Sequence, residues 1–226
     1  MVTPDLTLLK ECQPKQINLR KSSWMKQKID LVAFDLGNVL CTVDEISAAK
    51  KLAAKNNQKW GYVHEIVFGQ DAKLRFERGE ITFDEHARNA IKTLKLDMSI
   101  TEVTEIYNSV IAPSTNMFPL VSQISKTYRI ALASNTSEPH WKYAQKFLPF
   151  SSLLNPVIVS YLVGTHKPEK AFYERLVNES GVPADRILFI DDLETNVEGA
   201  RKAGIIGLQF STQENLETAL TSLELL

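Results

Sequence analysis

The sequence predicts an α/β fold, in which a doubly wound, Rossmann-like parallel sheet carries an all-helical cap domain inserted after its first strand. Two observations support this prediction. Short runs that are apolar throughout alternate with segments of helical periodicity, and one long stretch near the N-terminus contains helical patterns only. Continuous apolar runs are typical of strands that helices bury on both faces, and alternation of such strands with helices produces a parallel sheet.

Five runs rich in Val, Ile, Leu and Phe are the expected strands. They cover residues 29–36, 129–134, 156–160, 186–191 and 205–210. Segments with an apolar stripe at helical spacing separate the later runs, at 119–126, 139–147, 169–179 and 194–203. Gly181 and Gly204 stand where C-terminal helix caps belong, so we expect the last two of these helices to end there.

The helical stretch after the first strand is expected to be a separate cap. Its helical patterns occupy residues 44–55, 62–68, 71–78, 83–94 and 100–110. Thr82 and Glu85 have the spacing of a capping box, which marks the start of a helix. The predicted domains are an N-terminal extension over 1–28, a Rossmann-like core over 29–41 and 114–226, and the helical cap over 42–113.

Composition argues against several classes of protein. The 226 residues carry a net charge of -1, so no overall positive charge indicates nucleic acid or anionic lipid as a partner. No apolar run is long enough to span a membrane. Cys12 and Cys41 fit no metal-binding or disulfide pattern, which favours the reducing cytoplasm as the compartment. The chain is expected to be a monomer or a homodimer. Residues 1–28 are expected to lie along the domain surface, with a transit peptide as the alternative.

Polar residues stand at the carboxyl ends of the first two expected strands, where an open α/β sheet binds its ligand. Asp35 follows a buried run and opens a glycine turn. It is either a turn cap or a carboxylate nucleophile of the kind that forms an aspartyl-phosphate. Ser134 and Asn135 end the second run, where a hydroxyl, an amide and backbone N–H groups can bind phosphate oxygens, although these residues are also ordinary in turns.

The later strand ends add a cation and two acids. Lys167 precedes the helix that begins after Pro168, where it is either solvated or a positive charge beside carboxylates. Asp191 and Asp192 follow four apolar residues, and two adjacent buried carboxylates repel one another unless a cation or proton intervenes. Mg²⁺, which prefers carboxylate oxygens and water, would satisfy this pair.

Four motifs together resemble those of the haloacid dehalogenase superfamily of hydrolases, most of which are phosphatases. FDLGNV, ASNT, KPE and FIDD occur in the expected order between about residue 31 and the C-terminus. RFERGEIT, residues 75–82, is similar to a cap segment of the subgroup around glucose-1-phosphate phosphatase and the phosphatase domain of soluble epoxide hydrolase. The resemblance implies a capped phosphatase that acts on a small-molecule phosphoester, with a sugar phosphate as one candidate.

The resemblance also implies a role for each motif residue. Asp35 would be the nucleophile, and Lys167 would neutralise both this carboxylate and the phosphate. Ser134 and Asn135 would hold the phosphoryl group. Mg²⁺ would be held by Asp35, the main-chain carbonyl of Gly37, Asp191 and Asp192.

Gly37 departs from the family pattern. Phosphatases of the family usually have an aspartate at this position, as general acid and base, and such groups contribute about 10²–10⁴-fold to the rate. Three readings follow: a phosphatase in which another group or water compensates, a metal-independent dehalogenase, or a catalytically weak relative that serves as a binding or regulatory module. Asp191 and Asp192 argue against the dehalogenase, because dehalogenases of the family use no metal.

The cap is expected to select the substrate. The residues that could face the site are Trp60, His64, Phe68, Lys73, Arg75 and Arg78. For each, packing within the cap or exposure to solvent is the stronger alternative. His166, beside Lys167, is a candidate proton donor but is expected to be a surface-loop histidine, and Asp44 is a further weak candidate.

Overall fold

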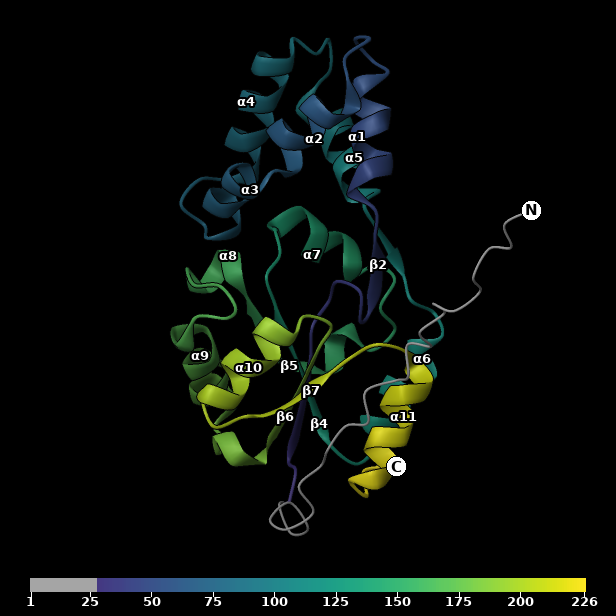
Figure 1. Ribbon diagram of the computed structural model, residues 1–226, viewed down its shortest axis with the longest axis vertical. Coiled ribbons are helices and arrows are strands. Elements are labelled where there is room, and N and C mark those ends of the chain that lie inside the picture. The colour runs from purple at the N-terminus through teal and green to yellow at the C-terminus, as the bar shows by residue number, and fades with distance from the viewer. Residues whose placement is uncertain (1–27) are drawn as a thin grey trace, which may run out of the picture.

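The structure, a computed structural model, describes residues 28–226. The extension predicted over 1–28 therefore lies, except for Lys28, outside the described residues. Figure 1 shows two parts along the long axis, a helical cap above and an α/β core below. Within the described residues, no helix is long and apolar enough to cross a membrane.

The predicted parallel sheet is confirmed. Over residues 28–226 it has five strands in the order β5-β4-β1-β6-β7, and each neighbouring pair is parallel. The strands are β1 (Leu31–Phe34), β4 (Arg129–Ser134), β5 (Leu154–Val159), β6 (Ile187–Asp191) and β7 (Ile206–Gln209). The first strand thus lies at the centre of the sheet, between β4 and β6.

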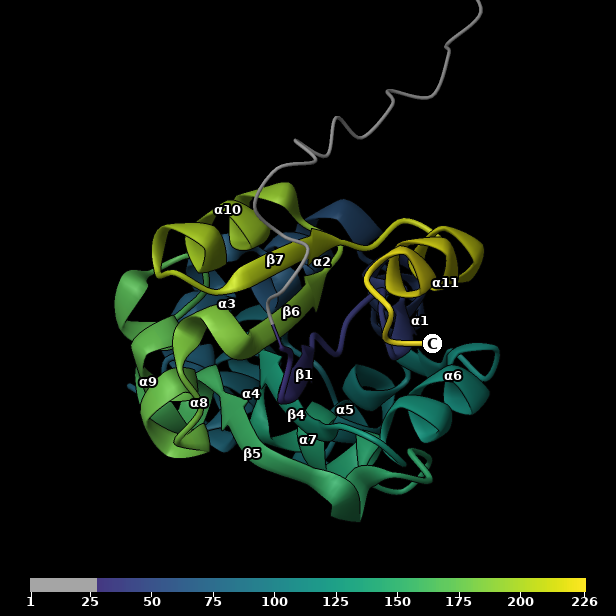
Figure 2. The ribbon, with the colours of Figure 1, turned by 90° about the horizontal axis from the view of Figure 1, so that it is seen from below.

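Helices cover both faces of the sheet (Figure 2). Alternate residues of β1 point to opposite faces, because side chains of a strand alternate. Leu31 and Ala33 pack with α9 (Lys170–Ser180) and α10 (Glu194–Lys202), whereas Val32 and Phe34 belong to the cluster that includes α6 (Met117–Ile124) and α11 (Gln213–Ser222). Gly181 ends α9 with a φ of +67°, as its position in the sequence predicted.

The boundaries of β5 differ from the prediction. The strand begins at Leu154, two residues before the expected start, and it ends at Val159 because Ser160 starts the short helix α8 (Ser160–Val163). Pro156 therefore lies inside the strand. A proline is tolerated there because β5 is the edge strand of the described sheet, where one side of the strand pairs with no other described strand.

The cap consists of five helices. They are α1 (Glu45–Ala53), α2 (Trp60–Phe68), α3 (Gln70–Glu77), α4 (Phe83–Leu94) and α5 (Ile100–Asn108). Thr82 and Glu85 form the expected capping box at the start of α4. The expectation of helices alone in this stretch was wrong at its two ends, where β2 (Cys41–Val43) and β3 (Ile111–Pro113) form an antiparallel pair. The two crossings between cap and core run side by side and satisfy each other's backbone groups, in strands too short to leave a sequence pattern.

The core contains elements that the sequence patterns did not indicate. The helix α11 packs Leu216 and Leu220 into the main apolar cluster. By contrast, the helix α7 (Glu138–Ala144) confirms the helix expected over residues 139–147, and it follows β4 and lies beneath the cap (Figure 1). Two short 3₁₀ turns, at Ser151–Leu153 and Ala184–Arg186, lead into β5 and β6.

Candidate active site

Three polar side chains meet at the carboxyl edge of the sheet because their strands are neighbours. Asp35 follows β1, Ser134 ends β4 and Asp191 ends β6. The central position of β1 places Asp35 between the other two. All three side chains are buried, and polar groups so placed require partners.

Lys167 is the partner of the two acids. Its Nζ lies 2.8 Å from Oδ1 of Asp35 and 2.6 Å from Oδ2 of Asp191, and only 4% of the residue is exposed. Burial alone would lower the pKa of Lys167, but the two carboxylates together raise it above its usual value. The ammonium group therefore remains charged, and the solvated alternative for Lys167 is excluded.

One lysine does not balance two buried carboxylates. The pKa of Asp35 is raised to about 6, chiefly by burial and also by the charge of Asp191, although Lys167 and the Ser134 hydroxyl oppose the shift. Because the ionised form of Asp35 remains disfavoured despite the lysine, the site has room for more positive charge.

The carboxylates are arranged so that a cation could supply this charge. One oxygen atom from each of Asp35, Asp191 and Asp192 lies within 4.8 Å of the others. Asp191 is fixed by Lys167, by the backbone N–H of Leu193 at 2.9 Å and by the Asn196 amide at 2.9 and 3.1 Å. An oxygen set of this kind fits Mg²⁺.

The side chain of Asn135 forms hydrogen bonds that the sequence did not predict. Its Nδ2 donates to the carbonyl of Lys167 at 2.9 Å, and its Oδ1 accepts from the N–H of Lys167 at 2.8 Å. The side-chain amide thus holds the Lys167 backbone. The Nδ2 atom of Asn135 carries a second N–H, so phosphate binding by Asn135 stays a prediction, and Ser134 keeps a hydroxyl beside Asp35.

A cavity of about 130 Å³ lies between this edge and the cap. Its core side includes Gly37, Ser134 and Asn135. The cap and the crossings contribute both apolar and charged side chains. These lining residues are Cys41, Val43, Glu45, Lys73, Glu77, Tyr107, Val110 and Ile111, with Thr136 and His140 from the start of α7.

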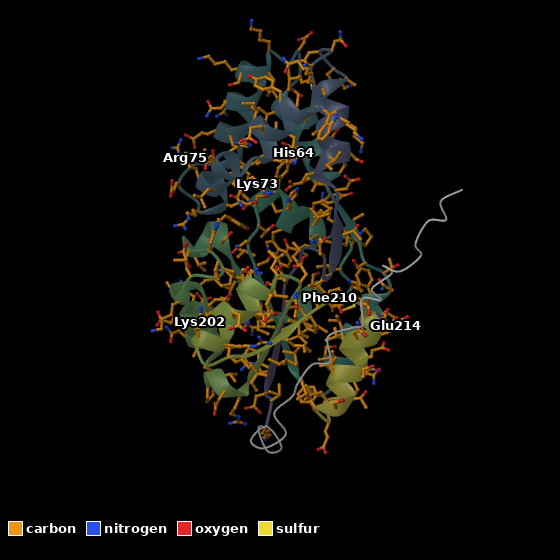
Figure 3. All side chains as sticks on the ribbon, viewed as in Figure 1. His64, Lys73, Arg75, Lys202, Phe210 and Glu214 are labelled. Atoms are coloured by element: carbon orange, nitrogen blue, oxygen red, sulfur yellow. The ribbon has the colours of Figure 1, made fainter. Side chains whose placement is uncertain are left out.

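Two of the six cap candidates lie at or near the cavity. Lys73 lines it and pairs with Glu45 at 2.6 Å, and His64 contacts the other oxygen of the same carboxylate at 3.2 Å. Figure 3 shows Lys73 on the side of the cap that faces the core and Arg75 at its outer edge. Arg75 is exposed beside Glu80, at 3.8 Å.

The other cap candidates do not line the cavity and contact other residues of the protein instead. Phe68 is buried and stacks on Tyr107, with ring centroids 5.7 Å apart. Trp60 is 45% exposed beneath the ammonium group of Lys50. Arg78 forms an ion pair with Glu169 of the core.

The two further candidates are also placed by the structure. His166 is buried, so its expected position in a surface loop was wrong. Burial lowers the pKa of its ring, which lies against the backbone of Glu77. Asp44 caps α1, because its Oδ1 accepts from the N–H of Ser47 at 2.9 Å.

Sequence reasoning missed several residues around the site. Asn38 has a φ of +54° and donates to Oδ2 of Asp192 at 3.0 Å, and its place in the FDLGNV motif was the available signal. Tyr107 and His140 stack across the boundary of cap and core, with centroids 4.0 Å apart. For Glu77, Tyr107 and His140 no local pattern reveals the cavity, because they come from three separate helices.

A family model of haloacid dehalogenase-like hydrolases matches residues 29–204. The chain belongs to this family and is a hydrolase of the haloacid dehalogenase-like class, as the four motifs predicted.

Curated relatives are distant but consistent in kind. The chain is 28% identical over 151 residues to flavin mononucleotide hydrolase 1 of Arabidopsis thaliana, a match that covers 66% of this chain and 61% of the relative. It is 24% identical to the sesquiterpene phosphatase astK of Aspergillus oryzae, covering 79% and 88%. It is 21% identical to D-ribitol-5-phosphate phosphatase of Bacteroides thetaiotaomicron, covering 76% and 87%. The matches to two other relatives cover only 35% and 19% of the length of those relatives.

Solved structures share the fold. A family enzyme of Bacteroides thetaiotaomicron, bt-2542, superposes with a TM-score of 0.75 at 23% identity, over 85% of this chain and 98% of that one. The same enzyme has been crystallised with magnesium and inorganic phosphate, and that structure superposes with a TM-score of 0.72. The L-2-haloacid dehalogenase of Xanthobacter autotrophicus is less similar. It superposes with a TM-score of 0.61 at 18% identity, over 86% of this chain and 83% of that one.

Proposed function

We propose that the protein is a Mg²⁺-dependent phosphomonoesterase that hydrolyses a small, polar phosphoester through an aspartyl-phosphate at Asp35. One observation carries this proposal: the Lys167 ammonium group lies between Asp35 and Asp191, beside a third carboxylate from Asp192. A buried carboxylate paired with a cation suits nucleophilic attack on a phosphoryl group, whose charge also needs neutralisation.

The chain's own residues have distinct tasks in this reaction. The Asp35 carboxylate attacks phosphorus, and Lys167 and Ser134 donate to the phosphoryl oxygens. A bound Mg²⁺, held by Asp35, Asp191, Asp192 and the carbonyl of Gly37, would neutralise charge on these oxygens. The cap closes over the site and excludes bulk water while the aspartyl-phosphate forms.

The cavity limits the size of the leaving group. At about 130 Å³ it is well below the ~300–1,000 Å³ of pockets that enclose drug-sized ligands. With the cap as it stands, a flavin ring system or a sesquiterpene chain exceeds this space. The acceptable leaving groups are therefore small.

The lining sets the polarity of the leaving group. Glu45 and Lys73 present a carboxylate and an ammonium group, and Tyr107 and His140 add polar edges. When an apolar leaving group fills the cavity, the charged side chains that face it lose their hydrogen bonds to water and gain none in exchange. A leaving group with hydroxyls replaces those hydrogen bonds. This favours a hydroxylated leaving group, such as that of a sugar or polyol phosphate.

Phosphate release tests the proposal. Wild type and Asp35→Asn are compared on a polyol phosphate, a sugar phosphate, flavin mononucleotide and a sesquiterpenyl phosphate, with Mg²⁺ and with a chelator. We expect Mg²⁺-dependent turnover that favours the small polar esters and is absent from Asp35→Asn. Chelator-resistant release of halide from a 2-haloacid would instead establish the dehalogenase, and measurable Mg²⁺ binding without turnover would favour the binding module.

A further inference from the structure

Gly37 stands where related phosphatases have a general acid and base, and Asp35, Ser134, Lys167, Asp191 and Asp192 have other roles in the proposed site. It lines the cavity two residues after Asp35 and carries no side chain. A phosphoester with an alcohol leaving group needs a proton donor for the departing oxygen and a base for the attacking water. A side chain that could exchange protons must therefore come from elsewhere in the cavity lining.

Glu77, the last residue of α3, brings a carboxyl group to the same cavity from the cap side. Within the described part of the chain, its side chain has no hydrogen bond or ion pair, unlike Glu45, which holds both Lys73 and His64. A partly buried carboxyl without a fixed partner is free to bond to a ligand or a water molecule.

The turn after Glu77 is fixed to the core. Arg78 forms an ion pair with Glu169, two residues beyond Lys167. Gly79 has a φ of +71°, and a Cβ there would lie only 2.3 Å from the carbonyl oxygen of Tyr161. This close packing holds the position of Glu77 relative to the segment that carries Lys167, so the carboxyl group is presented to the cavity reproducibly.

The charges around Glu77 suit proton transfer near neutral pH. Burial raises the pKa of Glu77 to about 7, with Lys73 opposing and Glu45 reinforcing the shift. Burial lowers the pKa of the neighbouring His140 to about 4, so this ring is a poor acid at neutral pH. Burial raises the pKa of the Cys41 thiol, and that of the Tyr107 hydroxyl, far above neutrality.

We propose that Glu77 is the general acid and base of the reaction and supplies from the cap the function that Gly37 lacks. This inference rests on the proposed phosphatase activity. In the first step Asp35 forms a bond to phosphorus, the ester P–O bond breaks, and the departing oxygen takes the proton of the Glu77 carboxyl. In the second step water attacks phosphorus and gives its proton to the Glu77 carboxylate, and the P–O bond to Asp35 breaks, releasing phosphate and restoring both side chains.

Glu77→Gln tests the proposal, since it keeps the shape of the side chain and removes the exchangeable proton. With a polyol phosphate, we expect kcat to fall by about 10²–10⁴-fold. Glu80→Gln is the matched control, because Glu80 is an exposed carboxylate on the same turn and should leave turnover unchanged. With p-nitrophenyl phosphate, whose leaving group departs without a proton, Glu77→Gln should still release a burst of nitrophenol before its slow steady state.

A rescue variant separates chemistry from misfolding. A Cβ at Gly37 would have Val43 Cγ2 as its nearest contact outside the adjacent residues, at 3.4 Å, so the backbone accepts a side chain at this position and keeps its main-chain carbonyl. The double variant Gly37→Asp with Glu77→Gln should have a kcat at least about tenfold higher than that of Glu77→Gln alone. Equal turnover of Glu77→Gln and wild type, or a loss without burst or rescue, overturns the inference. If wild type itself hydrolyses no phosphoester, the proposed function fails first and this inference with it.

Discussion

The side-chain amide of Asn135 forms two hydrogen bonds with the backbone of Lys167, one donated at 2.9 Å and one accepted at 2.8 Å. This pairing joins the end of β4 to the loop that carries the site's cation. The position of the ammonium group therefore depends on Asn135, the residue that follows β4, and not on the Lys167 loop alone.

Replacing Asn135 by Ala should loosen that loop. Two backbone groups of Lys167 lose their partners, and an unpaired buried polar group costs about 1–3 kcal/mol. We expect a lower free energy of unfolding in urea and a reduced kcat, because Lys167 no longer has a fixed position. An unaltered kcat in a destabilised variant would show that the amide serves stability alone.

Lys167→Met should destabilise the fold strongly. It leaves Asp35 and Asp191 without their shared cation, and breaking a buried ion pair in this way costs about 3–5 kcal/mol. Lys170→Met is the control, because among the described residues that exposed lysine pairs with Glu174 alone, and solvent screens such a surface pair so that its loss should change stability little. Denaturant unfolding measures the free energy of unfolding of both variants. Equal decreases in this free energy would contradict the central role given to Lys167.

Mg²⁺ should raise the melting temperature of the wild type, since an ion that binds only the folded chain stabilises it. Asp192→Asn should weaken this rise, because it removes one of three clustered carboxylates. Asp185→Asn, which alters an exposed acid of the turn before β6, should leave the rise intact. Melting curves over a series of Mg²⁺ concentrations check this, and an identical response of all three proteins would place the ion elsewhere.

Glu77→Gln should stabilise the fold above neutral pH. The pKa of Glu77 is 4.5 in an unperturbed chain and about 7 in the fold. As the pH rises past 4.5, the unfolded chain releases this proton while the folded chain retains it. Folding stability therefore falls between pH 4.5 and about 7 and stays lower above that range. Gln removes this loss, which is at most about 3 kcal/mol. Unfolding at pH 4.5 and pH 8 measures it: the gain should appear only at pH 8.

Gly79→Ala should damage the contact between cap and core. The left-handed φ of +71° and the Tyr161 carbonyl at 2.3 Å leave no place for a methyl group, so we expect lower stability and lower kcat. Gly61→Ala is the matched change in α2, where a Cβ meets nothing within 4 Å, and it should stabilise by about 0.5–1 kcal/mol. A harmless Gly79→Ala would remove the argument that this turn positions Glu77.

The sequence predicted what depends on local pattern and on general topology. Continuous apolar runs located the strands, and the rule that parallel strands end at one edge brought Asp35, Ser134 and Asp191 together. The β2–β3 pair was missed because three residues are too few to establish a period. Glu77 was missed because it reaches the cavity through tertiary packing: the Arg78–Glu169 pair joins residues 91 positions apart.

The covalent mechanism at Asp35 is tested most directly by trapping its intermediate. The protein is mixed with Mg²⁺ and a polyol phosphate, quenched in acid within the first turnovers, digested and examined by mass spectrometry. We expect one added phosphoryl group on Asp35 in the wild type, a larger phosphorylated fraction in Glu77→Gln with p-nitrophenyl phosphate, and none in Asp35→Asn. Turnover by the wild type with no phosphoryl group on Asp35, or sustained turnover by Asp35→Asn, would contradict this mechanism.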